Sequence, residues 1–184
     1  MIEKLTEKNL DSLVELHKQV LGHTVNSQIG GWFLKKLYGL TMQFAFCYVF
    51  IEEHKVLGFI SYCRDRAEFS DRILQNLTWR DKAKIASFLL SHPSSIVAIK
   101  KLRSFLELLR SFSCPYILTM GVSPEVQGRG IGRWLLDTVK NEVQGKVMVD
   151  TEDSNLRAVN FYRKNGFTML LQKYGNTILE FHNT

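Results

Sequence analysis

The stretch from Gln127 to Gly132 reads Gln-Gly-Arg-Gly-Ile-Gly, and it decides the fold. It lies between an expected strand, Tyr116 to Val122, and an expected helix, Ile131 to Gln144. Backbone N–H groups and the positive end of a helix dipole meet at such a junction, where they bind phosphate oxygens. The same pattern is also typical of a tight turn before a helix, so the surrounding sequence has to decide.

Two familiar nucleotide-binding loops do not fit this stretch. A dinucleotide fingerprint needs a third glycine where Arg133 stands, and a P-loop needs a Gly-Lys-Ser/Thr sequence that is absent. If this stretch binds phosphate, it does so as neither a dinucleotide-binding loop nor a P-loop.

The sequence that follows the loop predicts an α/β fold. Residues 146–151 form an expected strand, so that strand, helix and strand make a right-handed βαβ unit. A further helix is expected from Asn155 to Asn165, capped by Ser154 and ended by a left-handed Gly166. Two final strands, 167–174 and 177–181, are expected to form a hairpin about Gly175-Asn176.

The N-terminal part is expected to supply two helices and a strand hairpin. Apolar spacing predicts a helix from Thr6 to near Gly22, a polar loop, and a second helix from Ile29 to near Gly39. The aromatic and branched residues 44–51 and 56–62 predict two antiparallel strands joined by a polar turn.

Residues 71–112 have a different character, because apolar positions at helical spacing alternate with basic ones. About two helices are expected there, with a break at His92-Pro93. Between Arg64 and Arg110 ten Lys or Arg residues face five Asp or Glu residues, which accounts for most of the net charge of +6. Such an excess suits an anionic acceptor, a nucleic acid, a membrane surface or simply a solvated helix face.

Two ordered motifs resemble those of the GCN5-related N-acetyltransferase (GNAT) superfamily. The first is (Gln/Arg)-x-x-Gly-x-(Gly/Ala), matched by Gln127, Gly130 and Gly132 after Val122-Ser123-Pro124. The second, further along the chain, is Asn155-x-x-Ala158-x-x-x-Tyr162-x-x-x-Gly166-Phe167. The resemblance covers residues 116–182 well and the N-terminal elements loosely, while the helical block departs from the usual short connection.

The resemblance implies a single domain over residues 1–184. Its mixed, mostly antiparallel central sheet would contain a parallel, splayed strand pair, with helices on both faces. The helical block would be an insert at about residues 66–113, between the third and fourth strands. The composition of this insert would suit amphipathic helices that cover the acceptor cleft.

The resemblance also implies an N-acetyltransferase that uses acetyl-CoA as acyl donor and no metal. The acetyl group would pass by direct attack to a primary amine of a small molecule, such as an amino sugar or a polyamine. The residues implied to bind the donor are Met120, Gly121, Val122, Gln127, Gly128, Arg129, Gly130, Ile131, Gly132, Asn155, Ala158 and Tyr162. Gly121 is in addition consistent with a strand bulge or a close backbone approach.

Three residues make up the predicted catalytic set. The N–H of Val122 would stabilise the oxyanion, and Tyr162 would donate a proton or hydrogen bond to the leaving thiolate. The base is open among Glu125, beside the loop, and three others in turns and loops: Glu52, Glu53 and His23. Glu125 is the one included in the set.

Other functions and partners remain open at this point. The alternatives are a non-catalytic acyl-CoA-binding or regulatory module and an acetyltransferase that acts on a protein amine. No nucleic acid is expected, because the aromatic and basic interleaving of known modules is absent. An anionic acceptor is compatible with the basic insert. A peripheral membrane contact through this insert is not favoured. The protein is expected to be a monomer or a homodimer.

The remaining composition predicts a cytoplasmic protein. Cys47, Cys63 and Cys114 are widely spaced without a CxxC pair, which is typical of reduced thiols rather than of disulfides or a metal site. The N-terminal residues lack the apolar core of a signal peptide, and no stretch approaches ~20 uncharged apolar residues.

Overall fold

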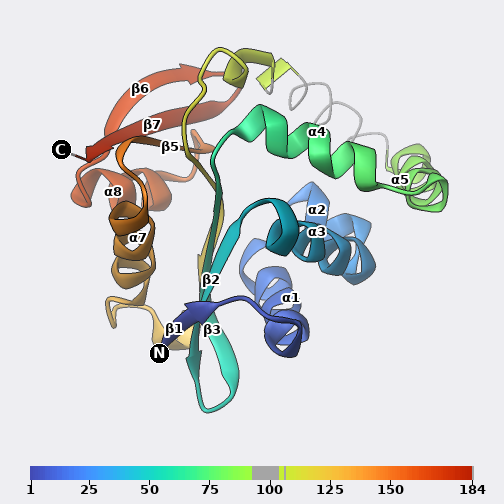
Figure 1. The fold of residues 1–184 in the computed structure, drawn as a ribbon, viewed down its shortest axis with the longest axis horizontal. Coiled ribbons are helices and arrows are strands. Elements are labelled where there is room, and N and C mark those ends of the chain that lie inside the picture. The colour runs from blue at the N-terminus through green and yellow to red at the C-terminus, as the bar shows by residue number, and fades with distance from the viewer. Residues whose placement is uncertain (93–103, 106, 184) are drawn as a thin grey trace.

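The centre of the molecule is a sheet, seen in a computed structural model that describes residues 1–92, 104–105 and 107–183 (Figure 1). Its strands are β1 (Ile2–Lys4), β2 (Phe46–Glu52), β3 (Lys55–Cys63), β4 (Tyr116–Val122), β5 (Gly145–Glu152), β6 (Thr168–Lys173) and β7 (Asn176–Asn183). The seven strands lie in the order β1-β2-β3-β4-β5-β7-β6. Only β4 and β5 run parallel, so the predicted mixed, mostly antiparallel sheet is confirmed.

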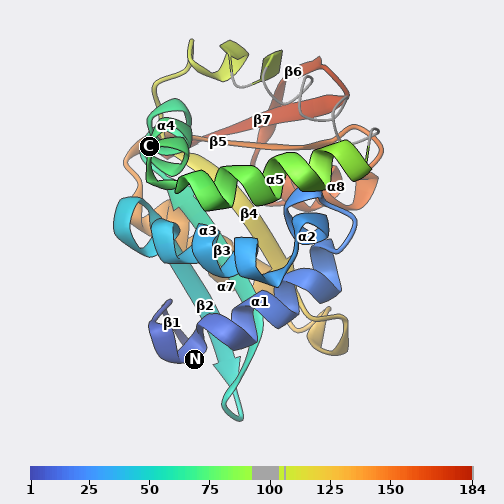
Figure 2. The same cartoon turned by 90° about the vertical axis from the view of Figure 1, so that its right-hand side faces the viewer.

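The helices are α1 (Glu7–Leu21), α2 (Val25–Ile29), α3 (Gly31–Phe44), α4 (Arg66–Asn76), α5 (Trp79–Ser91), α7 (Ile131–Glu142) and α8 (Leu156–Lys164). A 3-10 turn, η1 (Pro124–Val126), follows β4, and residues 104–105 and 107–109 are also helical. Helices cover both faces of the sheet, as predicted. Figures 1 and 2 show α7 and α8 on one face and α1, α3 and α4 on the other.

Two expectations about the elements were wrong in detail, and one strand was not predicted. The three-residue strand β1 was not predicted, because a run this short and polar gives no periodic signal; it pairs with the edge of β2. The expected polar loop contains α2. Helix α3 does not end near Gly39 but continues to Phe44, because burial of Leu40 and Thr41 outweighs the cost of a helical glycine.

The hairpin turn between β6 and β7 is displaced by one residue from its prediction. Tyr174 and Gly175, with φ of 57° and 84°, form the two-residue turn, and Asn176 already belongs to β7. The turn between β2 and β3 has the same form, with Glu53 and His54 at φ of 49° and 63°. Left-handed residues at both central positions match the twist of the flanking strands.

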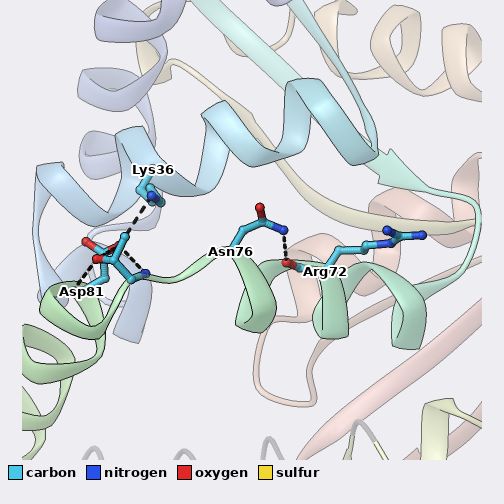
Figure 3. A network of polar contacts seen from close by, with 5 residues as sticks. Lys36, Arg72, Asn76 and Asp81 are labelled. Atoms are coloured by element: carbon cyan, nitrogen blue, oxygen red, sulfur yellow. Dashed lines mark hydrogen bonds and ion pairs between the residues drawn. The ribbon is translucent and has the colours of Figure 1, made fainter.

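The helical block between β3 and β4 divides earlier than predicted. Helix α4 ends at Asn76, and Thr78 starts α5 through a capping box with Asp81. Asp81 also lies 3.5 Å from Lys36 of α3, which ties the block to the N-terminal helices (Figure 3). Helix α5 ends at Ser91, next to the predicted break, and most of the predicted second pattern lies outside the described residues.

Among the described residues, the cysteines form no disulfide and the helices are not of the membrane-spanning kind. Cys47, Cys63 and Cys114 are all unpaired, and the first two are buried. Within the described ranges, no helix has the length and apolar character that crossing a membrane requires.

A buried histidine lies in the core between α1 and the sheet. The side chain of His17 is 3% exposed, its Nδ1 lies 2.7 Å from the Tyr38 hydroxyl, and its ring stacks on Phe59. Burial lowers the pKa of His17 to about 4. His17 is therefore neutral in the folded protein at pH 7.

This burial predicts a pH dependence of stability. Between pH ~6.5 and ~4 the unfolded chain protonates His17 while the folded chain does not, so the free energy of unfolding falls as the pH is lowered, by up to about 3 kcal/mol for this group. Urea unfolding of wild type and His17→Gln across this range measures the difference. An identical pH slope in the two proteins would rule out the assignment.

Candidate functional site

Strands β4 and β5 separate almost as soon as they meet. They pair only through Tyr116 with Met148 and Ile117 with Val149. Directly after this point the pairing of β4 with β3 is irregular, because Leu118 is an extra residue between the pairs that Ile117 and Thr119 form with β3. The bulge thus lies at Leu118 and not at Gly121, the residue that sequence reasoning had singled out.

The bulge changes which backbone groups of β4 face the open gap. Before it, the carbonyl of Pro115 accepts a hydrogen bond from the N–H of Met148 in β5. After it, the N–H of Ser123 bonds to the Leu57 carbonyl in β3. Because these directions alternate along a strand, one extra residue reverses them. The N–H and C=O groups of Met120 and Val122 therefore face away from β3, toward the gap.

A cavity of about 460 Å³ occupies this gap. It is bounded by the end of β4, the loop to α7, the first turn of α7, helix α8 and the C-terminal end of α1. Its lining residues are Val20, Leu21, Met120, Gly121, Val122, Val126, Gln127, Gly128, Gly130, Ile131, Gly132, Arg133, Asn155, Arg157, Ala158, Phe161 and Tyr162. All the residues predicted to bind the donor except Arg129 are in this set.

The glycine-rich loop opens α7 in the manner that its sequence predicts. Gly128 and Gly130 have φ of 86° and 82°, and Gly130 is the N-cap of α7 without a side-chain cap. The first N–H groups of α7 and the helix dipole therefore point at the cavity wall, where they suit an anion.

Two other glycines lie at close contacts, of which Gly121 leaves no space for a Cβ atom and Gly132 leaves little. A Cβ at Gly121 would lie 2.6 Å from Cγ2 of Val20 and 2.7 Å from the Phe59 ring. A Cβ at Gly132 would lie 3.2 Å from Cε of Met120 and 3.3 Å from the Phe161 ring. Gly121 thus lets α1 approach β4 closely, and Gly132 lets the start of α7 lie close to both β4 and α8.

Gln127 connects three walls of the cavity. Its side-chain amide donates a hydrogen bond to the Val122 carbonyl at 3.1 Å and accepts one from Arg157 at 2.5 Å. The first bond shows directly that the Val122 carbonyl is accessible from the cavity. Arg157 and Arg133, which sequence reasoning did not select, are the two cations of the lining.

Arg129 and Glu125 lie elsewhere. The guanidinium of Arg129 makes a bidentate contact with Glu52, at 2.7 and 2.8 Å, on the outer side of the loop. Glu125 is exposed in η1 and does not line the cavity. Of the other acids and bases considered, Glu53 lies in the β2–β3 turn and His23 is exposed after α1.

Helix α8 presents the second motif to the cavity. Asn155, not Ser154, is its N-cap, and the Asn155 Oδ1 atom accepts from the Ala158 N–H at 3.1 Å. One turn further on, Tyr162 is buried, and its hydroxyl lies 3.9 Å from the Met120 sulfur. Burial, with a smaller contribution from Asp150, raises the pKa of Tyr162 well above 10. The hydroxyl therefore stays protonated and acts as a donor.

A carboxylate that sequence reasoning missed lies where the strands part. Asp150 is the first residue of β5 beyond its pairing with β4, and its Oδ1 accepts a hydrogen bond from the Tyr116 hydroxyl at 2.7 Å. Burial raises the pKa of Asp150, and the Tyr116 bond opposes the rise. An acid interrupting the apolar run Val147-Met148-Val149 was the signal that would have found it.

The cavity lining contains Arg133, Arg157 and Tyr162 as its titratable side chains, so no carboxylate or imidazole is among the described lining residues. The described ranges also hold no group of three or more His, Cys, Asp or Glu side chains suited to a metal ion. The described part of the site therefore offers backbone groups, cations and a tyrosine, and Asp150 lies outside the lining, at the point where the strands part.

Comparison with known proteins agrees with this geometry. The model of the Acetyltransferase (GNAT) family matches residues 26–167, and no curated protein gives a match. PH1933 from Pyrococcus horikoshii OT3 shares the fold with a TM-score of 0.63 at 17% identity, covering 100% of this chain and 98% of that one. So does the ribosomal-protein-S18-alanine N-acetyltransferase from Escherichia coli, with a TM-score of 0.62 at 12% identity, covering 100% and 94%.

A third similar structure was solved in complex with coenzyme A. It is the PaiA N-acetyltransferase from Thermoplasma acidophilum, with a TM-score of 0.62 at 14% identity, covering 99% of this chain and 98% of that one. At these identities the likeness is one of fold. The family model, which spans most of the chain, goes further: the chain belongs to the GNAT family of acetyltransferases.

Proposed function

We propose that the protein transfers the acetyl group of acetyl-CoA to a primary amine of a small molecule, by direct attack in a ternary complex. The observation that carries this proposal is the open edge of β4 beside the glycine-rich loop. The amide-containing arm of the donor is an extended chain, and the backbone groups of Met120 and Val122 that face the gap without a strand partner suit it as they would an added strand.

The charged end of the donor suits the other half of the cavity. The backbone of Gly128, Gly130 and Gly132 and the start of α7 would hold its pyrophosphate, and Arg133 and Arg157 would supply positive charge. Asn155, Ala158 and Tyr162 would line the opposite side.

Val122 and Tyr162 have the two stabilising roles in the transfer. The N–H of Val122 would donate to the carbonyl oxygen as the amine nitrogen attacks the carbonyl carbon. When the carbon–sulfur bond breaks, the Tyr162 hydroxyl would donate to the departing sulfur. A thiol with a pKa of ~8.5 needs only modest help to leave, which a buried, protonated phenol provides.

The amine proton needs an acceptor, since an amine of pKa ~10.4 is neutral at pH 7 in only about one molecule in 2,500. We assign this role to Asp150 in preference to Glu125. Neither carboxylate lines the cavity, but Asp150 stands at the point where β4 and β5 part and lies close enough to Tyr162 to affect its pKa, whereas Glu125 is exposed in η1. Its raised pKa also makes it a stronger base than an ordinary aspartate.

A protein amine is the second candidate acceptor. The Escherichia coli protein with the same fold is named for an alanine of a ribosomal protein, so the fold accommodates such a substrate. A non-catalytic acyl-CoA-binding module is the third reading, and only activity separates it from the first two.

The proposed function predicts that acetyl-CoA raises the melting temperature, because a ligand at 100 times its Kd stabilises the folded state by ~2.7 kcal/mol. Longer acyl-CoAs serve as the comparison for chain length. Thiol release is then followed with amino sugars, polyamines and peptides with a free N-terminus. Without a melting shift the proposal fails; a shift without release for any acceptor identifies a binding module.

Tyr162→Phe is expected to slow thiol release by ~10- to 100-fold with little change in the Kd for acetyl-CoA, because only the donated hydrogen bond is lost. Single-turnover rates and donor titration measure the two effects. Turnover equal to wild type would remove Tyr162 from the mechanism.

Asp150→Asn is expected to lower kcat by roughly 100-fold at neutral pH and to leave the KM for acetyl-CoA unchanged. The loss should shrink as the pH approaches the pKa of the amine, since less of the amine then has to be deprotonated before it attacks; the proton that the nitrogen loses after attack passes to the leaving thiolate or to water. Glu125→Gln is the competing variant. If Glu125→Gln shows this loss of kcat and Asp150→Asn does not, the base is Glu125, as the sequence alone predicts.

A further inference from the structure

Arg129 stands in the middle of the glycine-rich loop, yet it faces away from the cavity. Its two terminal nitrogens contact the two carboxylate oxygens of Glu52, 77 positions earlier, at 2.7 and 2.8 Å. This fork-to-fork geometry is the strongest form of an Arg–carboxylate pair. It lowers the pKa of Glu52 and raises that of Arg129.

The loop has few other restraints on this outer side. A Cβ at Gly128 would meet no atom within 4 Å, so packing does not hold the loop there. The two backbone hydrogen bonds inside the loop, from the N–H of Gln127 and from that of Arg129, are both long at 3.4 Å. On this outer side the loop is therefore held by the link to Glu52, while on the cavity side Gln127 bonds to Val122 and Arg157.

Glu52, the partner of Arg129, is held in place by the β2–β3 hairpin. Glu52 is the last residue of β2 and pairs with Lys55 across a two-residue turn. On the same strand, the ring of Phe50 contacts Trp134 of α7 at 6.1 Å between centroids. Strand β2 thus contacts both the loop and the first turn of the helix that the loop opens.

We propose that Arg129 is a positioning residue, which fixes the phosphate-binding loop to the β2–β3 hairpin through Glu52, and that the charge for the phosphates comes from Arg133 and Arg157. This inference rests on the proposed function. Both terminal nitrogens of Arg129 contact Glu52 and its side chain is not part of the cavity lining, whereas Arg133 and Arg157 line the cavity.

The two possible roles of Arg129 predict opposite effects of a change at Glu52. If Arg129 positions the loop, Glu52→Gln weakens coenzyme A binding by about three- to fivefold, the scale of a well-formed exposed pair, and Arg129→Gln does the same. If Arg129 is instead a phosphate ligand restrained by Glu52, then Glu52→Gln frees it and binding becomes tighter or stays unchanged.

The experiment is calorimetric titration of the full chain with coenzyme A. The variants are Glu52→Gln, Arg129→Gln, their combination, and the exchanged pair Glu52→Arg with Arg129→Glu; Glu53→Gln, in the same turn, is the matched control. The proposal expects equal losses in the single variants, no further loss in the combination, and recovery in the exchanged pair. In turnover assays the KM for acetyl-CoA should rise while kcat is kept.

Three results overturn the proposal: binding by Glu52→Gln that equals or exceeds wild type, additive losses in the combined variant, or an exchanged pair weaker than either single variant. Melting temperatures recorded alongside show whether each variant is folded. Wild-type protein that binds no coenzyme A overturns the proposed function itself, which separates the two failures.

Discussion

The separation of β4 from β5 is the constraint on which the rest of the site depends. Neighbouring parallel strands normally satisfy each other's backbone hydrogen-bonding groups along their whole length. Between β4 and β5 this pairing stops after Ile117 and Val149. The extra residue at Leu118 reverses the direction of the following backbone groups, so that the groups of Met120 and Val122 face the gap without a strand partner. Unpaired backbone groups are costly when buried, and a ligand with amide groups can satisfy them.

The surrounding elements keep the strands apart and give the gap its shape. Helix α1 packs against Gly121 through Val20 at a distance that leaves no room for a Cβ atom, and α8 packs closely against Gly132 through Phe161. The hairpin of β2 and β3 meets the loop from outside through Glu52. Much of the proposed binding surface is backbone, whose geometry does not depend on side-chain identity.

The C-terminal half was predictable because its signals are local. The boundaries of β4, the left-handed Gly166 and the βαβ order all follow from periodicity and glycine chemistry. The N-terminal half was predicted less well, since β1 exists only through its pairing with β2, and α3 passes Gly39 only because its far end is buried. Tertiary packing decided both.

The candidate site shows the same division. The motif residues were predictable, apart from Arg129, whose partner Glu52 is too distant in sequence to foresee. Arg157 and Asp150 belong to neither motif. Arg157 bonds to Gln127 across the cavity, and Asp150 accepts a hydrogen bond from Tyr116. Only the fold brings these pairs together.

The most direct test of the opened strand is amide hydrogen exchange by NMR, with and without coenzyme A. The account predicts that the N–H of Val122, which faces the gap, becomes protected when coenzyme A binds, while the N–H of Gly121, which faces β3, is unchanged. Saturating coenzyme A that leaves Val122 exchange unaltered would contradict the account.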